Sequence, residues 1–238
     1  MLFRSIISET NAHPLNHEET GGSVGPYVAA ALNGDVDNHL ELVERHGLAI
    51  APEITTDAKV IPTLVSHALA DGTDLVEAFR STVASFEGSV AIAAHADTEP
   101  GRLLLALRGS GQALYVGLAD DAFVVASEPY GVVEETDSYL RLDGETPGNP
   151  ENPGASRGQI VVLDAAGAGS PLGVTRLAYD GTVLPVTAED LQTAQITTRD
   201  IDRGDHPHYL LKEISEAPAS FRKTLRGKLL EHDGRLRS

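Results

Sequence analysis

The spacing of apolar residues changes along the chain from helical to strand-like. Between Asp57 and Phe86 apolar side chains recur every three or four residues, which predicts two helices separated by a break at Asp71-Gly72. Short apolar runs separated by turns follow at residues 89–94, 102–107, 113–116, 122–126, 139–142, 159–163 and 174–179. This spacing is typical of antiparallel sheets. We therefore predict an α+β fold in which helices cover layered antiparallel strands.

The residues outside this region carry weaker patterns. Residues 26–32 predict a strand, 35–46 a short helix that Gly47 ends, and 48–51 another short strand. Residues 145–158 carry no large apolar side chain and predict a loop. Residues 208–217 predict a helix that ends at Pro218, because proline lacks the N–H that a helix interior requires.

The net charge limits the possible binding partners, and its distribution along the chain suggests two parts. The 238 residues carry 35 acidic and 18 basic side chains, a net charge of −17. Such a surface argues against binding to nucleic acid or to an anionic membrane, because both require a basic footprint. Residues 201–238 are net basic whereas residues 1–200 hold the acidic excess. We therefore predict one acidic domain over residues 6–200 and a separate tail over residues 201–238.

The chain contains no cysteine, which excludes disulfides, thiolate metal sites and a cysteine nucleophile within these 238 residues. Asp205, His206 and His208 offer too few ligands for a metal, so we predict neither a metal nor a cofactor.

Residues 1–5 do not form a secretory signal, and the default expectation is a cytoplasmic protein. We interpret residues 1–5 as a scar at the edge of an assembled sequencing read.

Two short motifs have both a structural and a chemical interpretation. Asn33-Gly34 is typical of a plain turn, but an asparagine amide beside a glycine N–H also forms an oxyanion hole. Thr55-Thr56-Asp57 precedes a predicted helix and is typical of an N-cap. The carboxylate of Asp57 is equally able to hold the ammonium group of a ligand. The residues alone leave both alternatives open.

The order of several motifs is more specific than any one of them. The motifs are S-E-x-N-A-H-P at 8–14, N-G-x-x-x-N at 33–38, T-D-x-x-V-I at 56–61, F-E-G-S at 86–89, R-x-S at 108–110, A-S-E at 126–128, H-Y-L-L-K-E-I-x-E-x-P at 208–218 and T-L-R-G at 224–227. From about Ile6 to about Leu230, this succession resembles the glutaminase domain of the glutamine–fructose-6-phosphate amidotransferases. The resemblance implies an N-terminal-nucleophile hydrolase-like αββα sandwich, the class II glutamine amidotransferase fold, incomplete at its N-terminus.

The same resemblance implies a mechanism and partners. In the family an N-terminal cysteine attacks the side-chain amide of glutamine, and its own α-amino group is the general base. Asn33 and Gly34 match the oxyanion-hole pair, and Asp57 matches the residue that recognises the α-amino group of glutamine. The family implies fructose 6-phosphate as acceptor in separate sugar-isomerase domains, and a homo-oligomeric enzyme. The tail from Ile201 would then be the linker toward those domains.

The chain also departs from the family pattern. The cysteine is absent, and residues 1–5 stand where the family has an arginine segment that holds the α-carboxylate of glutamine. Leu32 replaces a histidine, and Thr55–Lys59 replaces a more acidic run. We therefore expect a fragment without its nucleophile, in which strands such as Pro26–Leu32 lack pairing partners. The alternatives are a catalytically inactive binding or regulatory protein with the same fold, or an unrelated acidic binding module.

Overall fold

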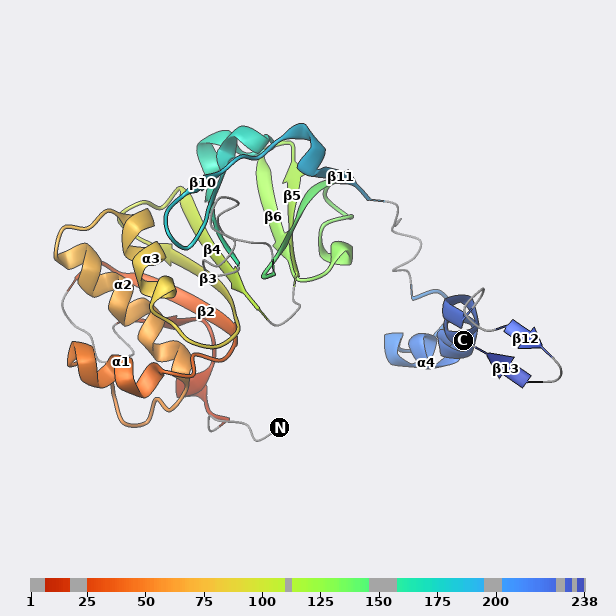
Figure 1. The fold of residues 1–238 in the computed structure, drawn as a ribbon, viewed down its shortest axis with the longest axis horizontal. Helices are drawn as coiled ribbons and strands as arrows, with labels where there is room; N and C mark the ends of the chain where they lie inside the picture. Colours follow the sequence, from red (N-terminus) through yellow and green to blue (C-terminus); the bar gives the residue numbers. More distant parts are fainter. Residues whose placement is uncertain are drawn as a thin grey trace. The chain divides into compact units, whose positions relative to one another are not determined.

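The computed structural model describes residues 7–17, 25–109, 113–145, 158–194, 203–225, 230–232 and 235–237. The chain divides into two compact units, Met1–Ile196 and Thr197–Ser238. Figure 1 shows the elements of both units. The candidate site belongs to the first unit.

Three helices of the first unit follow one another near its start. They are α1 (His39–His46), α2 (Val60–Ala70) and α3 (Leu75–Ala84). The side chain of Asp74 caps α3 by accepting the N–H groups of Val76 and Glu77 at 3.0 and 3.1 Å. Gly47 ends α1 in the left-handed conformation. Pro62 lies in the first turn of α2, where a missing N–H costs no intrahelical bond.

The larger sheet has seven antiparallel strands in the order β1-β2-β3-β4-β8-β9-β10. Their bounds are Leu15–Asn16, Val28–Gly34, Val90–Ala96, Arg102–Arg108, Gln159–Asp164, Val174–Leu177 and Val183–Leu184. The helices α1–α3 cover one face of this sheet (Figure 1). The core there includes the fully buried side chains of Leu42, Val65, Phe79 and Leu104.

The smaller sheet has four antiparallel strands in the order β11-β7-β5-β6. Their bounds are Leu191–Thr193, Ser138–Asp143, Ala113–Ala119 and Ala122–Ala126. A second core lies between the two sheets and includes Leu105, Val116 and Leu140. Successive side chains of β4 pack into different cores, because side chains alternate between the two faces of a strand. Leu104 faces the helices and Leu105 faces the second sheet.

Short 3-10 turns connect these elements. They are η1 (Glu9–Asn11), η2 (Asp57–Lys59), η3 (Pro129–Gly131), η4 (Ala165–Gly167), η5 (Pro171–Gly173) and η6 (Ala188–Asp190). Among the described residues, the first unit thus has one layer of α-helices and two layers of strands. The predicted α+β class with stacked antiparallel sheets is confirmed.

Several details differ from the sequence predictions. Residues 48–51 form no strand, and residues 146–157 of the predicted loop lie outside the described part of the chain. The strand predicted at 26–32 runs from Val28 to Gly34 and pairs with β3 over its whole length. Its expected lack of partners is therefore wrong on the β3 side, whereas on the other side β1 pairs only with Ala29 and Ala30. At the end of the smaller sheet it is β6, paired with β5 alone, that leaves an edge open within the described residues.

Two histidine rings complete the other edge of β2, where β1 contributes only two residues. The ring of His17 accepts the N–H of Val28, and the ring of His13 accepts the N–H of Leu32, each at 3.3 Å through Nδ1. Buried strand N–H groups require acceptors, and side chains supply them where the neighbouring strand is too short.

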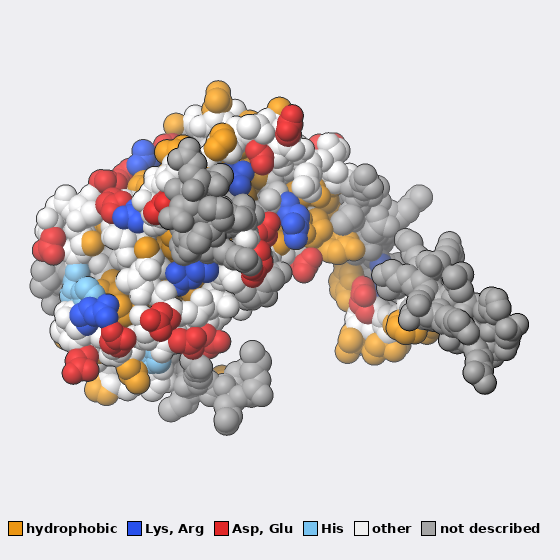
Figure 2. Space-filling model, in the orientation of Figure 1, with side chains coloured by type: hydrophobic (Ala, Val, Ile, Leu, Met, Phe, Trp, Pro, Cys, Tyr) orange, Lys and Arg blue, Asp and Glu red, His pale blue; other side chains and the backbone are white. Residues whose placement is uncertain are grey.

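The second unit contains α4 (Tyr209–Leu225) and a hairpin of β12 (Leu230–His232) with β13 (Arg235–Arg237). Pro218 lies inside α4 and does not end it, so the predicted boundary is wrong. Figure 2 shows hydrophobic side chains gathered on α4. The exposed members are Tyr209, Leu210, Leu211, Ile214 and Phe221.

Candidate functional site

The end of β2 is shaped by a close approach of two backbone segments. Gly34 has a φ of +136°, and a Cβ atom there would lie 2.1 Å from the carbonyl oxygen of Ser89. The N–H of Asp35 donates to the same oxygen at 2.9 Å. Asn33 and Gly34 remain in the ladder opposite Ala91 and Val90, so their interpretation as a plain hairpin turn is wrong. Glycine is needed here for both its conformation and its lack of a side chain.

The chain after Gly34 is fastened to the segment that precedes β3. The side chain of Asn38 accepts the N–H of Glu87 at 3.0 Å and donates to the carbonyl of Ser85 at 2.9 Å. Gly88 leaves room for the carbonyl of Asp35, because a Cβ on Gly88 would lie 2.3 Å from that oxygen. The motifs N-G-x-x-x-N and F-E-G-S thus form one structure, although about fifty residues separate them.

Asp57 holds the same segment from the other side. Its Oδ2 accepts the N–H of Val36, a fully buried residue, at 2.6 Å. The cap of the following turn is Thr56, whose hydroxyl accepts the N–H of Ala58 at 3.4 Å. The N-cap interpretation of this motif therefore applies to Thr56, and the carboxylate of Asp57 has a different contact, two residues beyond Gly34.

The side chain of Lys59 interacts electrostatically with the carboxylate of Asp57. The ammonium of Lys59 donates to the carbonyl of Ile54 at 3.0 Å. Partial burial lowers the pKa of Lys59, and the negative charge of Asp57 opposes that shift. The half-buried Asp57 carboxylate therefore has a cation on its own turn.

Asn11 anchors the turn that carries Asp57. Its Oδ1 accepts the N–H groups of Thr55 at 2.7 Å and of Thr56 at 3.0 Å, and its Nδ2 donates to the hydroxyl of Ser8 at 2.8 Å. Two donors facing one atom require that atom to be the oxygen, so the contacts fix the orientation of the amide. Asn11 itself is buried.

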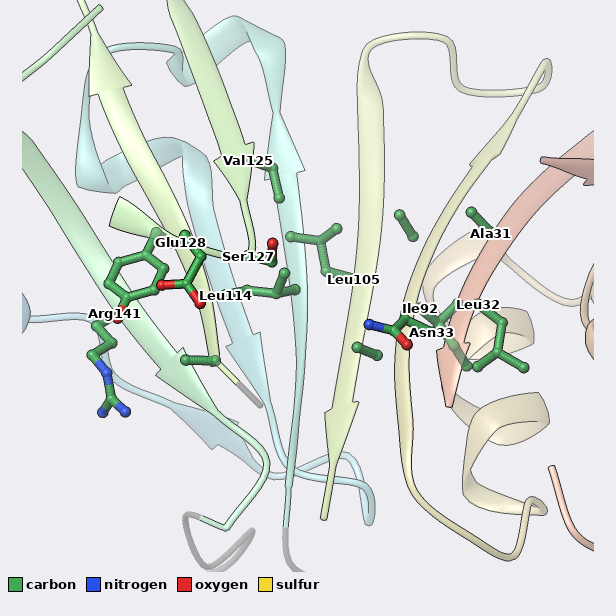
Figure 3. A pocket seen from close by; sticks show the side chains of 14 residues that line it. Ala31, Leu32, Asn33, Ile92, Leu105, Leu114, Val125, Ser127, Glu128 and Arg141 are labelled. Carbon is green, nitrogen blue, oxygen red and sulfur yellow. The ribbon is translucent and has the colours of Figure 1, made fainter. Parts of the chain in front are cut away.

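A cavity of about 660 Å³ lies between the two sheets beside Asn33. Figure 3 shows the side chain of Asn33 pointing from the end of β2 into this space, with Leu105 on β4 near it and Ser127 and Glu128 on the opposite side. Within the described residues the amide of Asn33 makes no hydrogen bond. An exposed amide without a protein partner at a cavity wall is available to a ligand.

Small side chains form much of the cavity wall on the larger sheet. Ala31 on β2 and Ala91 and Ala93 on β3 line it, and all three are half-buried. The second sheet therefore does not fully cover β2 and β3, although it covers β4 with the buried Leu105. The space beside Asn33 persists because alanine methyl groups do not fill it.

The structure brings the three predicted site residues to one place but not into one cavity. Asn33 lines the space between the sheets, whereas neither Gly34 nor Asp57 does. Asp57 reaches the same chain segment through Val36. A separate cavity of about 450 Å³ lies on the side of His13 and Glu53.

Sequence reasoning assigned no role to Asn11, Asn38 or Ser89, which the structure places around the end of β2. Asn11 and Asn38 stand inside motifs that were recognised only as family signatures. Their contacts depend on residues 44 to 49 positions away, so no local pattern indicates them. Ser89 acts through its backbone carbonyl, which side-chain chemistry does not reveal.

Within the described ranges, no group of three or more His, Asp or Glu side chains is arranged to hold a metal ion. None of the helices in the same ranges has the length and the apolar character that crossing a membrane requires.

Comparison with known proteins places this geometry in a class. No protein-family model matches the chain. A solved structure of glutamine phosphoribosylpyrophosphate amidotransferase from B. subtilis, complexed with ADP and GMP, superimposes with a TM-score of 0.52 over 75% of this chain and 34% of that one, at 18% identity. The fold is therefore that of the class II glutamine amidotransferases, the N-terminal-nucleophile type.

Proteins with similar sequences show which members of that class the chain resembles. Glutamine–fructose-6-phosphate aminotransferases (isomerizing) match at 28% identity over 97% of this chain in Halalkalibacterium halodurans, and at 30% over 96% in Geobacillus kaustophilus. The chain is homologous to the glutaminase domain of these enzymes, their glutamine-hydrolysing part. It spans about a third of the length of the curated relatives it matches.

Proposed function

We propose that the end of β2 is a glutamine site, in which Asn33 and Gly34 stabilise the oxyanion formed when the side-chain amide is attacked. The observation that carries the proposal is the amide of Asn33, which points into the cavity between the sheets and has no protein partner among the described residues. Preorganised donors of this kind act where charge develops in the transition state.

The chemistry assigns a separate task to each group. A nucleophile adds to the amide carbon and the carbonyl oxygen becomes negative, so the donors of Asn33 and Gly34 stabilise it. Collapse of the intermediate releases ammonia, and water then releases glutamate from the nucleophile. The nucleophile is not among these 238 residues if it is a cysteine, because the chain has none. This chain thus supplies the electrostatic part of the site.

Asp57 would recognise the α-ammonium group of glutamine. An ionised carboxylate has two oxygens with about four lone-pair sites. Val36 uses one of them, on Oδ2, and the hydroxyl of Thr56 uses another, on Oδ1 at 3.4 Å. The remaining acceptor capacity is sufficient for an ammonium group. Asp57 would then bind the ligand and the backbone beyond Gly34 at the same time.

We further propose that the parent enzyme transfers the released ammonia to fructose 6-phosphate, as the names of the relatives indicate. In this proposal residues 6–200 form the amidotransferase domain and residues 201–238 the linker toward sugar-isomerase domains. The exposed apolar side chains of α4, such as Leu210 and Phe221, support a docking role for this linker. The parent would be a cytoplasmic homo-oligomer.

A second function has one observation in its favour. The absence of cysteine from the 238 residues is what a catalytically inactive protein with the same fold would show. Such a protein would bind glutamine for regulation and would not hydrolyse it.

Isothermal titration of the 238-residue chain with L-glutamine tests the proposed site. We expect saturable binding that Asn33→Ala and Asp57→Ala each weaken, because each removes one contact to the ligand. D-Glutamine, which places its ammonium group differently, is the control and should bind more weakly. Equal heats for both stereoisomers, or no loss in either variant, would contradict the site.

A further inference from the structure

The turn that carries Asp57 is held by a residue to which the proposed chemistry gives no part. Asn11 is 9% exposed and lies in η1, 44 residues before Thr55. Its single oxygen accepts two successive backbone N–H groups, those of Thr55 and Thr56. Both belong to the stretch immediately before Asp57, which the carbonyl of Asn11 therefore fixes.

A chain of contacts leads from this turn to the oxyanion-hole residues. Thr56 caps the turn that begins at Asp57. Asp57 accepts the N–H of Val36 at 2.6 Å, and Val36 follows Gly34 by two residues. Each contact joins groups whose positions are determined by the previous one. A displacement of the Thr55–Asp57 turn would therefore change the hold on Val36.

The opposite side of the segment is already fixed. Ser89 accepts the N–H of Asp35, and Asn38 binds Ser85 and Glu87. The segment that Asp57 contacts through Val36 is therefore also hydrogen-bonded to the chain that leads into β3. Small movements of Asp57 would be taken up by the backbone between Gly34 and Val36.

We infer that Asn11 is a positioning residue, whose buried amide holds the Thr55–Asp57 turn so that Asp57 sets the backbone from Gly34 to Val36 for glutamine. The inference rests on the proposed glutamine site for its ligand. The structural link from Asn11 to Val36 stands on the contacts alone and is testable without a ligand.

Three variants separate positioning from general stability. Asn11→Leu keeps the approximate size but leaves the N–H groups of Thr55 and Thr56 without their acceptor. Asn11→Asp keeps an oxygen facing both groups and is the conservative rescue. Ser66→Ala is the matched control, because its buried hydroxyl donates to the carbonyl of Pro26 at 2.7 Å, near the end of β2 that is remote from Gly34.

The first measurement is amide hydrogen exchange of Gly34 and Val36 by NMR in the 238-residue chain. We expect Asn11→Leu to shift the Val36 resonance and to raise its exchange rate by about tenfold, the scale of one lost buried hydrogen bond. Asn11→Asp should retain the parent values. Ser66→Ala should lower the melting temperature without changing either amide. Unchanged amides in Asn11→Leu, or equal changes in Ser66→Ala, would overturn the inference.

The second measurement is L-glutamine affinity of the same variants, each studied below its melting transition. Asn11→Leu should weaken binding by about tenfold and Asn11→Asp should not, in line with the amide readout. If the parent chain itself does not bind glutamine, the proposed function fails, whereas the exchange result still decides whether Asn11 positions Val36. If the parent binds and Asn11→Leu binds equally well, the positioning role is wrong.

Discussion

Asp57 accepts the backbone N–H of Val36 at 2.6 Å and so joins the start of the second helical segment to the end of β2. The residue that matches the family's ammonium-binding aspartate is therefore also part of the frame of the predicted oxyanion hole. In the proposed site, one carboxylate would both recognise the ligand and help to place the oxyanion donors. This coupling distinguishes the structure from a set of independent contacts.

Gly34→Ala should destabilise the fold strongly. The added Cβ would lie 2.1 Å from the carbonyl of Ser89, and the φ of +136° is unfavourable for alanine. We expect a loss of about 2–4 kcal/mol in the free energy of unfolding, measured with urea. Gly47→Ala is the control: its φ is +59° with no atom within 4 Å, so its cost should be about 1 kcal/mol. Similar losses for both would show that the contact with Ser89 is not restrictive.

Substitutions at Asp57 should separate its two roles. Asp57→Ala leaves the buried N–H of Val36 without its acceptor and should cost about 1–3 kcal/mol of stability. Asp57→Asn keeps an acceptor oxygen but loses the charge, so it should fold with little loss while glutamine affinity falls. Urea unfolding and glutamine titration of both variants give the two quantities. Full glutamine affinity in Asp57→Asn would leave the carboxylate with only its contact to Val36.

Catalysis should require a supplied nucleophile. The 238-residue chain should release no ammonia from glutamine above a blank, because it has no cysteine. A chimera that carries the N-terminal segment of the Geobacillus kaustophilus relative ahead of Ile6 should hydrolyse glutamine. In that chimera Asn33→Ala should lower kcat by about 10²–10³-fold, the usual scale for one oxyanion donor. An unchanged kcat would show that Asn33 has no catalytic part.

Asp190 should make the fold sensitive to acid. Hydrogen bonds from Thr187, with the charge of Arg176 contributing, lower the pKa of this carboxyl in the folded state. A lowered folded pKa stabilises the fold above the unfolded pKa, and this contribution is lost as pH falls through the folded value. The stability difference between the parent and Asp190→Asn should therefore be largest near pH 7 and should shrink below about pH 4. A difference that does not change with pH would contradict this assignment.

Local patterns were sufficient for most of the scaffold. The short apolar runs of β3 to β9 and the helical spacing from Val60 to Val83 report burial, and the elements form where that burial is available. Residues 48–51 were predicted as a strand but have no strand beside them. Pro218 lies inside α4, since a helix tolerates a proline when the rest of its turns remain intact.

The site was less predictable because its geometry is non-local. The plain-turn alternative at Asn33-Gly34 is excluded by pairing with β3 and by the close approach of Ser89, 55 positions away, whereas the oxyanion-hole alternative stays a prediction. The N-cap interpretation was correct for Thr56 but not for Asp57, whose partner Val36 belongs to another element. The order of the family motifs singled out Asn33, Gly34 and Asp57, and the contacts between distant segments explain why the three residues lie close together.

The cavity beside Asn33 depends on the small size of three alanine side chains in its wall. Ala31, Ala91 and Ala93 lie on strands with regular pairing, so the hollow arises from side-chain volume and not from an interruption of the backbone. One larger residue, such as leucine at position 31, would fill part of the hollow while every strand stayed in register. Small side chains at these three positions therefore leave volume beside Asn33 while the strands stay paired, and each larger residue there would reduce that volume.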